Sequence, residues 1–184
     1  MACDLTLGRL EPCKDSIGGI EAVYFINYDG LGTVAYDTGD TDVIDDLGTG
    51  VTAYKYELKS DENTYSETIN SSRENGTTFF EQNLSISLKG LTAADQKEIR
   101  LLAYGRPHVV IHTRNGEAFI AGLEQGCEVN GGETTQVGGA YGDKVGYTVT
   151  MVGREAKPAN WLEGATKADP FAGLANAPSV VSGS

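Results

Sequence analysis

The pattern of apolar and polar residues predicts strands along most of the chain, most clearly within residues 117–153. In residues 145–152 small polar residues share one face, and the opposite face holds Val145, Tyr147, Val149 and Met151. This alternation is typical of a half-buried strand. Residues 118–123 are apolar on both faces, which predicts a strand covered on both sides.

Further strands are predicted from alternation, from β-branched and aromatic residues or from the turns that they flank. They are predicted at residues 21–28, 33–36, 51–58, 64–72, 77–82, 83–89 and 108–113. The Asn115-Gly116 pair predicts a hairpin with a type I′ turn, in which both central residues need positive φ. Residues 73–76 predict a second hairpin with polar strands, which would be marginally stable alone in water. Contact with a neighbouring subunit or a wet channel would explain it.

One helix is predicted, from Ala93 to Tyr104. Thr92 is a plausible N-cap, and Asp95 follows it at the spacing of a capping box. Gly105 is expected in the left-handed conformation after the last turn, and Pro107 prevents the helix from continuing.

These elements predict a mainly β fold: an antiparallel β-sandwich or barrel with one flanking α-helix. We expect an N-terminal arm over residues 1–20, the folded domain over residues 21–156 and a C-terminal arm over residues 157–184. The glycine-rich segment 126–146 is expected to be a loop. Large apolar residues in the C-terminal segment, Trp161 and Phe171, indicate that it docks on its own domain or on a neighbour.

Composition narrows the classes of function. The chain has 184 residues, a net charge of −12 and a pI of about 4.5, so it lacks the basic surface that sequence-specific nucleic-acid binding needs. The cysteines Cys3, Cys13 and Cys127 form no metal or disulfide pattern and indicate free thiols. No secretion signal and no membrane-spanning run is recognisable, so no membrane partner is expected.

The most acidic segment is residues 37–50, with no basic residue and with five aspartates: Asp37, Asp40, Asp42, Asp45 and Asp46. Carboxylates at alternate positions can converge on Ca²⁺. However, the spacing lacks the glycine and the final glutamate of an EF-hand loop. We therefore expect a solvated, self-repelling loop.

No catalytic motif is present, and the chain is not expected to be an enzyme. A phosphate-binding glycine loop, a nucleophile elbow and a zinc-protease motif are all missing. His108 and His112 lie on one face of a predicted strand but about 13 Å apart, too far to share one ion. No cofactor and no metal site is predicted.

The order of elements from Thr77 to Ala156 points to a family. An amphipathic strand precedes the capped helix LTAADQKEIRLLA, the hairpin HVVIHTRNGEAFIAGLE and the segment GGAYGDKVGYTVTMVGRE. This order resembles the tail tube (major tail) proteins of tailed bacteriophages and, more distantly, the Hcp tube protein of type VI secretion. The resemblance covers less than half of the chain and rests on element order.

The resemblance implies a structural virion protein located in a phage tail and assembled in the host cytoplasm. Copies would form hexameric rings that stack into a tube with an acidic channel, through which DNA passes without specific binding. Partners would be further copies, the tape measure, the tail terminator and the baseplate or tail tip. Residues expected at contacts between subunits are Asp37, Asp40, Asp42, Asp45, Asp46, Arg73, Glu74, Trp161 and Phe171. The alternative is a capsid decoration protein, a head–tail joining protein or another non-enzymatic virion β-module.

Overall fold

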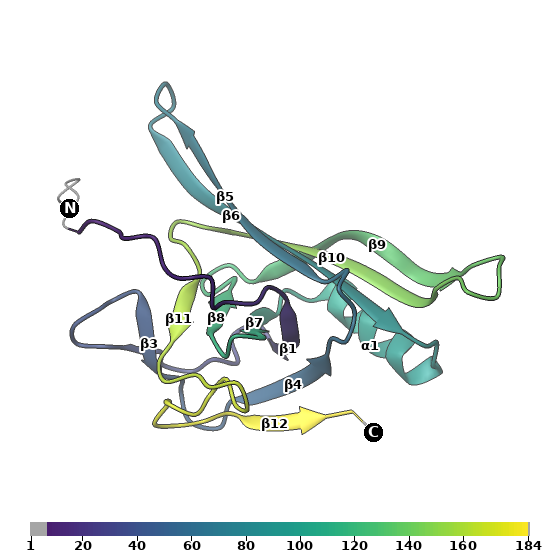
Figure 1. Ribbon diagram of the computed structural model, residues 1–184. Helices are drawn as coiled ribbons and strands as arrows, with labels where there is room; N and C mark the ends of the chain where they lie inside the picture. Colours follow the sequence, from purple (N-terminus) through teal and green to yellow (C-terminus); the bar gives the residue numbers. More distant parts are fainter. Residues whose placement is uncertain (1–6, 184) are drawn as a thin grey trace.

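The computed structural model describes residues 7–183 and contains two β-sheets packed against each other, with one helix at their side (Figure 1). The smaller sheet has the order β5-β6-β10-β9, with β5 (Thr64–Ser72), β6 (Thr77–Lys89), β10 (Val145–Glu155) and β9 (Cys127–Val137). All of its neighbouring strands are antiparallel. The mainly β fold with one flanking helix is confirmed.

The larger sheet has the order β12-β4-β1-β7-β8-β11-β3-β2. Its strands are β12 (Ser179–Ser182), β4 (Thr52–Glu57), β1 (Ile20–Ile26), β7 (His108–Thr113), β8 (Ala118–Ala121), β11 (Asn160–Leu162), β3 (Val43–Asp46) and β2 (Ala35–Tyr36). Two pairings in it are parallel, β11 with β3 and β12 with β4.

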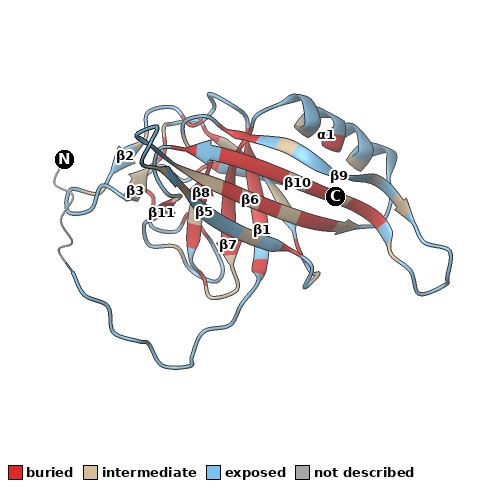
Figure 2. Cartoon of the chain, turned by 90° about the horizontal axis from the view of Figure 1, so that it is seen from above, coloured by how far each residue is buried: buried red, intermediate tan, exposed pale blue. Residues whose placement is uncertain are grey.

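Two apolar clusters fill the molecule, one on each face of the larger sheet. The first lies between the sheets and includes Val23, Ile111 and Val149. The second lies on the far face and includes Ile120. Strand β8 contributes to both clusters, which confirms that its two apolar faces are both covered. Figure 2 shows the buried residues along the middle strands and exposed residues at the hairpin tips.

Helix α1 (Ala93–Tyr104) has the predicted bounds and the predicted cap. The backbone N–H of Asp95 donates to Thr92 Oγ1 at 3.0 Å, and Ile99 is buried against the inter-sheet core. The predicted left-handed Gly105 is wrong, because its φ is −92° and its backbone is extended. The chain leaves the helix directly into β7, which needs extended backbone rather than a reversal.

The hairpin of β7 and β8 is confirmed, but not its type I′ turn. Only Gly116 has positive φ, at 95°. The N–H of Gly116 donates to the carbonyl of Thr113 at 3.0 Å, so Arg114 and Asn115 are the central residues of the turn and the glycine follows them. A three-residue connection with glycine in the left-handed position is a common alternative.

The C-terminal segment differs most from its prediction as an arm. Strand β11 lies inside the larger sheet, between β8 and β3. Leu162, Phe171 and Leu174 are buried in the far-face cluster. Sparse apolar residues separated by turns carry no periodicity, yet together they cover a sheet face that would otherwise be wet. The N-terminal residues 7–19 are extended and exposed, as expected for an arm, and Cys3 lies outside the described residues.

Candidate assembly surface

The outer strands of the smaller sheet, β5 and β9, have no strand partner on their outward side within residues 7–183. The strands alternate in direction across the sheet, so β5 and β9 run in opposite directions. Long unpaired edges are sites at which another chain can add a strand. The smaller sheet therefore presents two edges that can pair with each other between copies, in the same antiparallel pattern.

One face of this sheet points away from the core and is mainly polar, with Val152 and Phe79 as apolar residues on it. Val149 and Ile86 are paired and both point toward the core. Their neighbours along each strand therefore point away from it. The uncharged polar residues of this outward face include Thr64, Ser66, Thr68, Asn83, Ser85, Thr148 and Thr150. Hydroxyl and amide side chains hydrogen-bond to water, so the face is suited to a wet space and not to a second core.

Charged side chains on this outward face nearly balance. Arg154 Nε donates to Glu81 Oε2 at 2.9 Å, and Lys144 lies 3.5 Å from Glu62. A hydrogen bond from Ser87 and the charge of Lys144 lower the pKa of Glu62. The other charged residues directed to this side are Glu128, Glu133 and Lys89. Because this side of the sheet carries four acidic and three basic residues, most of the −12 net charge lies elsewhere.

The acidic segment is divided by the fold. Asp37, Asp40 and Asp42 lie in the exposed turn between β2 and β3. Asp37 Oδ2 accepts from the N–H of Asp40 at 3.1 Å, and Asp40 Oδ1 from that of Asp42 at 2.9 Å. These carboxylates therefore stabilise the turn itself, as aspartates often do. Asp40 and Asp42 are exposed and available to a neighbour, whereas Asp37 is half-buried.

Asp45 and Asp46 are not in a loop, because Val43–Asp46 forms strand β3. Asp46 Oδ1 accepts from the N–H of Asn176 at 2.7 Å. A hydrogen bond with Asp45, and the charge of that carboxylate, raise the pKa of Glu163. Both aspartates therefore contact the C-terminal segment of their own chain, and the expectation of a loop through Asp46 is wrong.

The other expected contact residues also lie in different parts of the fold and differ in exposure. Arg73 and Glu74 lie at the exposed tip of the β5–β6 hairpin, which projects from the body (Figure 1). Trp161 is 47% exposed, and its ring lies 5.7 Å from that of Phe119. Phe171 is 1% exposed and packs edge-on against Tyr24. Phe171 is therefore a core residue of its own chain, and its prediction as a contact between subunits is corrected.

A buried glutamine positions the base of the projecting β5–β6 hairpin. Gln82 Oε1 accepts from the N–H of Gly122 at 2.8 Å, and its Nε2 donates to Glu67 at 3.3 Å. The same Glu67 oxygen accepts from the N–H of Ala159. These bonds join both sheets and the C-terminal segment. No local pattern in the sequence indicates this role, because Gly122 lies 40 residues from Gln82 along the chain.

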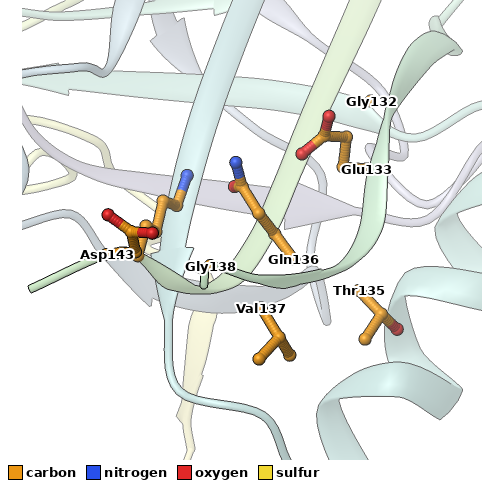
Figure 3. A pocket seen from close by; sticks show the side chains of 8 residues that line it. Gly132, Glu133, Thr135, Gln136, Val137, Gly138 and Asp143 are labelled. Carbon is orange, nitrogen blue, oxygen red and sulfur yellow. The ribbon is translucent and has the colours of Figure 1, made fainter. Parts of the chain in front are cut away.

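A hollow of about 810 Å³ lies along the β9–β10 hairpin and is open to solvent (Figure 3). Glu133 and Gln136 point to one side of β9, whereas Thr135 and Val137 point to the other, toward α1 (Figure 3). The two faces of the sheet are thus continued to the hairpin tip. The hollow leaves the edge and a face of β9 open to contact with another molecule, and it does not enclose a ligand.

The two histidines contact different backbone carbonyls. His108 Nδ1 lies 2.6 Å from the carbonyl of Gly122, and His112 Nε2 lies 2.8 Å from that of Thr166. Among the residues that the structure describes, no three His, Cys, Asp or Glu side chains form a group that could hold a metal ion. No helix between residues 7 and 183 has the length and apolar character needed to cross a membrane.

Comparisons with known proteins give little support for any assignment. No family model and no curated protein matches the chain. A solved structure described as the virion of a native gene transfer agent particle is similar with a TM-score of 0.36 and 7% identity. The match covers 58% of this chain and 88% of that one. A likeness at this level carries no argument about fold or role.

Proposed function

We propose that the chain is a structural subunit of a phage tail tube, in which six copies form a ring and rings stack. The observation that carries this proposal is the smaller sheet, with two free antiparallel edges and one polar face. When β5 of one copy pairs with β9 of the next, both edges of every smaller sheet in the ring are paired. The number six and the stacking come from the resemblance of the sequence to tail tube proteins.

The stagger of the strands agrees with a closed barrel. Positions along the sheet can be numbered by the residues of β10. On this scale β9 lies beside positions 145–153. Strand β5, placed on the same scale through its pairing with β6, lies at positions 150–158. Pairing β5 with β9 of the next copy therefore displaces each copy along the strands. Paired residues must share a face, so the displacement is even, and four or six residues give the best overlap.

These displacements set the tilt of the strands. Each copy contributes four strands at a spacing of about 4.8 Å to the barrel. The next copy is displaced along the strands by four or six residues of about 3.3 Å each. The resulting tilt to the barrel axis is about 35° or 46°, close to the range usual for closed barrels. Six copies then give a backbone diameter of roughly 45–53 Å. The outward polar face lines this channel.

The channel has a polar lining with a small acidic excess. Hydroxyl and amide side chains offer DNA no charge to bind, and like charges repel its phosphates. DNA accordingly passes without specific contacts. Tape measure, tail terminator and baseplate proteins are the partners that this role implies, and the virion tail is the location.

The first test is negative-stain electron microscopy of the purified protein over a concentration series, with light scattering in parallel. Rings or tubes with a central channel support the proposal. Trimers or monomers that bind only a preformed capsid shell support a decoration protein instead.

A labelling experiment tests which face lines the channel. In a background with Cys3 and Cys13 changed to serine, Ser85→Cys places a thiol on the outward face of the smaller sheet. Val180→Cys on β12 is the matched control, because Val180 is exposed on the larger sheet. In assembled particles a bulky maleimide should label the control and spare Ser85→Cys, whereas both should react in dissociated protein. Equal labelling in tubes contradicts the assigned channel face.

A further inference from the structure

The tip of the β9–β10 hairpin carries apolar side chains that its own chain does not cover. Val137 is 66% exposed, Val145 is 45% exposed and Tyr141 is fully exposed. Val137 and Val145 face each other across the hairpin. They share the core-facing side of the sheet with Tyr147, but the hairpin extends past the body there (Figures 1 and 2). Three exposed apolar side chains at one tip favour a contact with another surface.

A groove of about 310 Å³ lies at the opposite edge of the same sheet, beside the start of β5. Its walls include Ile20, Tyr65, Ile111 and Phe119. The rings of Tyr65 and Phe119 are 4.9 Å apart, and both side chains are only partly buried. Helix α1 packs near β9, and no such element covers the groove within the part of the chain that the structure describes.

The register connects the tip to the groove. If β5 pairs with β9 of the next copy at a displacement of four residues, Val137 of that copy lies opposite Asn63; at six, it lies opposite Tyr65. Asn63 and Tyr65 both line the groove. Tyr65 pairs with Leu84 and so faces the core side, which is the side on which Val137 lies. Both permitted registers therefore bring the tip to the groove with matching faces.

We propose that the groove receives the hairpin tip of a second copy of this chain, so that Val137, Tyr141 and Val145 cover Tyr65 and Phe119. This inference rests on the β5–β9 pairing of the proposed function. It assigns the apolar contact that fixes the register between copies, because backbone pairing alone allows a strand to slip along its partner.

Cross-linking between residues of the outward face tests the register. In the background without Cys3 and Cys13, Gln136→Cys is combined with Thr64→Cys for the four-residue register, or with Ser66→Cys for the six-residue register. Cβ atoms of directly paired residues lie about 5 Å apart, within reach of a short bis-maleimide. Gln136→Cys with Asn70→Cys is the control, because Asn70 lies at least four residues, or about 13 Å, farther along β5.

A ladder of covalent oligomers with one of the two pairs, and not with the control, is the expected result. Assembled rings without a ladder from either pair overturn this inference and leave the tube proposal standing. A ladder without rings or tubes supports the contact and overturns the tube proposal. Equal ladders from all three pairs overturn the assigned register.

An apolar-to-charged substitution tests the tip itself. Val137→Asp should raise the protein concentration needed for half-maximal assembly about tenfold or more, a loss of about 1.4 kcal/mol per tenfold. Val180→Asp is the matched control on β12, at a valine that is 43% exposed, and it should assemble like the wild type. Both variants should keep the wild-type circular dichroism spectrum. Unchanged assembly of Val137→Asp overturns the proposal.

Discussion

Replacement of Phe171 by alanine tests whether the C-terminal segment belongs to the fold. The ring is 1% exposed, and its centroid lies 5.1 Å from that of Tyr24 in an edge-on contact. Truncation of a buried phenylalanine costs about 3–5 kcal/mol. For a domain of this size 1 kcal/mol corresponds to a shift in Tm of about 2–4 °C. We therefore expect Phe171→Ala to lower Tm by about 6–20 °C.

The assay is thermal unfolding followed by circular dichroism, under conditions that keep the protein dissociated. Trp161→Ala is the matched control from the same segment, because Trp161 is 47% exposed and loses less buried area. Its Tm should fall by less than half as much. A Phe171→Ala variant with a Tm within about 2 °C of the wild type would refute the reasoning, and the segment would then be a loosely docked arm.

Three further outcomes follow from buried groups. Val149→Asp should give no folded protein, because it places an unpaired charge at a residue 2% exposed in the inter-sheet core; a soluble variant with a wild-type spectrum would contradict the assigned core. Gln82→Leu should cost about 1–3 kcal/mol, since it leaves the buried N–H of Gly122 without its acceptor, and urea unfolding measures this loss against the wild type. Burial lowers the pKa of His108, so the unfolded chain takes up the proton first. The stability that His108 contributes is fully present above about pH 6.5, the unperturbed pKa, and is lost as pH falls below it. His108→Gln should weaken this dependence of Tm between pH 7.5 and 5, and an unchanged slope would assign it to other groups.

The acidic character of the chain and the acidity of the proposed channel are different quantities. The sequence shows a net charge of −12, but the register directs comparable numbers of acids and bases to the outward face of the smaller sheet. Three of the five aspartates of the acidic segment lie in the turn between β2 and β3. Contacts between rings, rather than the channel, are where we expect these carboxylates to act.

Local signals in the sequence determined the elements that depend on neighbouring residues. The Thr92–Asp95 cap and Pro107 bound the helix at Ala93–Tyr104, and alternation located β10 and β4. Each of these signals is contained within a few residues, so no distant partner is needed to recognise it.

Only the tertiary structure decided the elements that depend on distant partners. The glycine-rich residues 127–137 form β9 because β10 supplies a partner along their whole length. The three residues of β11 form a strand because β8 and β3 lie on either side. Glycine and isolated apolar residues carry no periodicity, and strand pairing overrides weak local preference. For the same reason the sequence could predict a β-sandwich but not its two free edges, since an edge is defined by which strands meet in space.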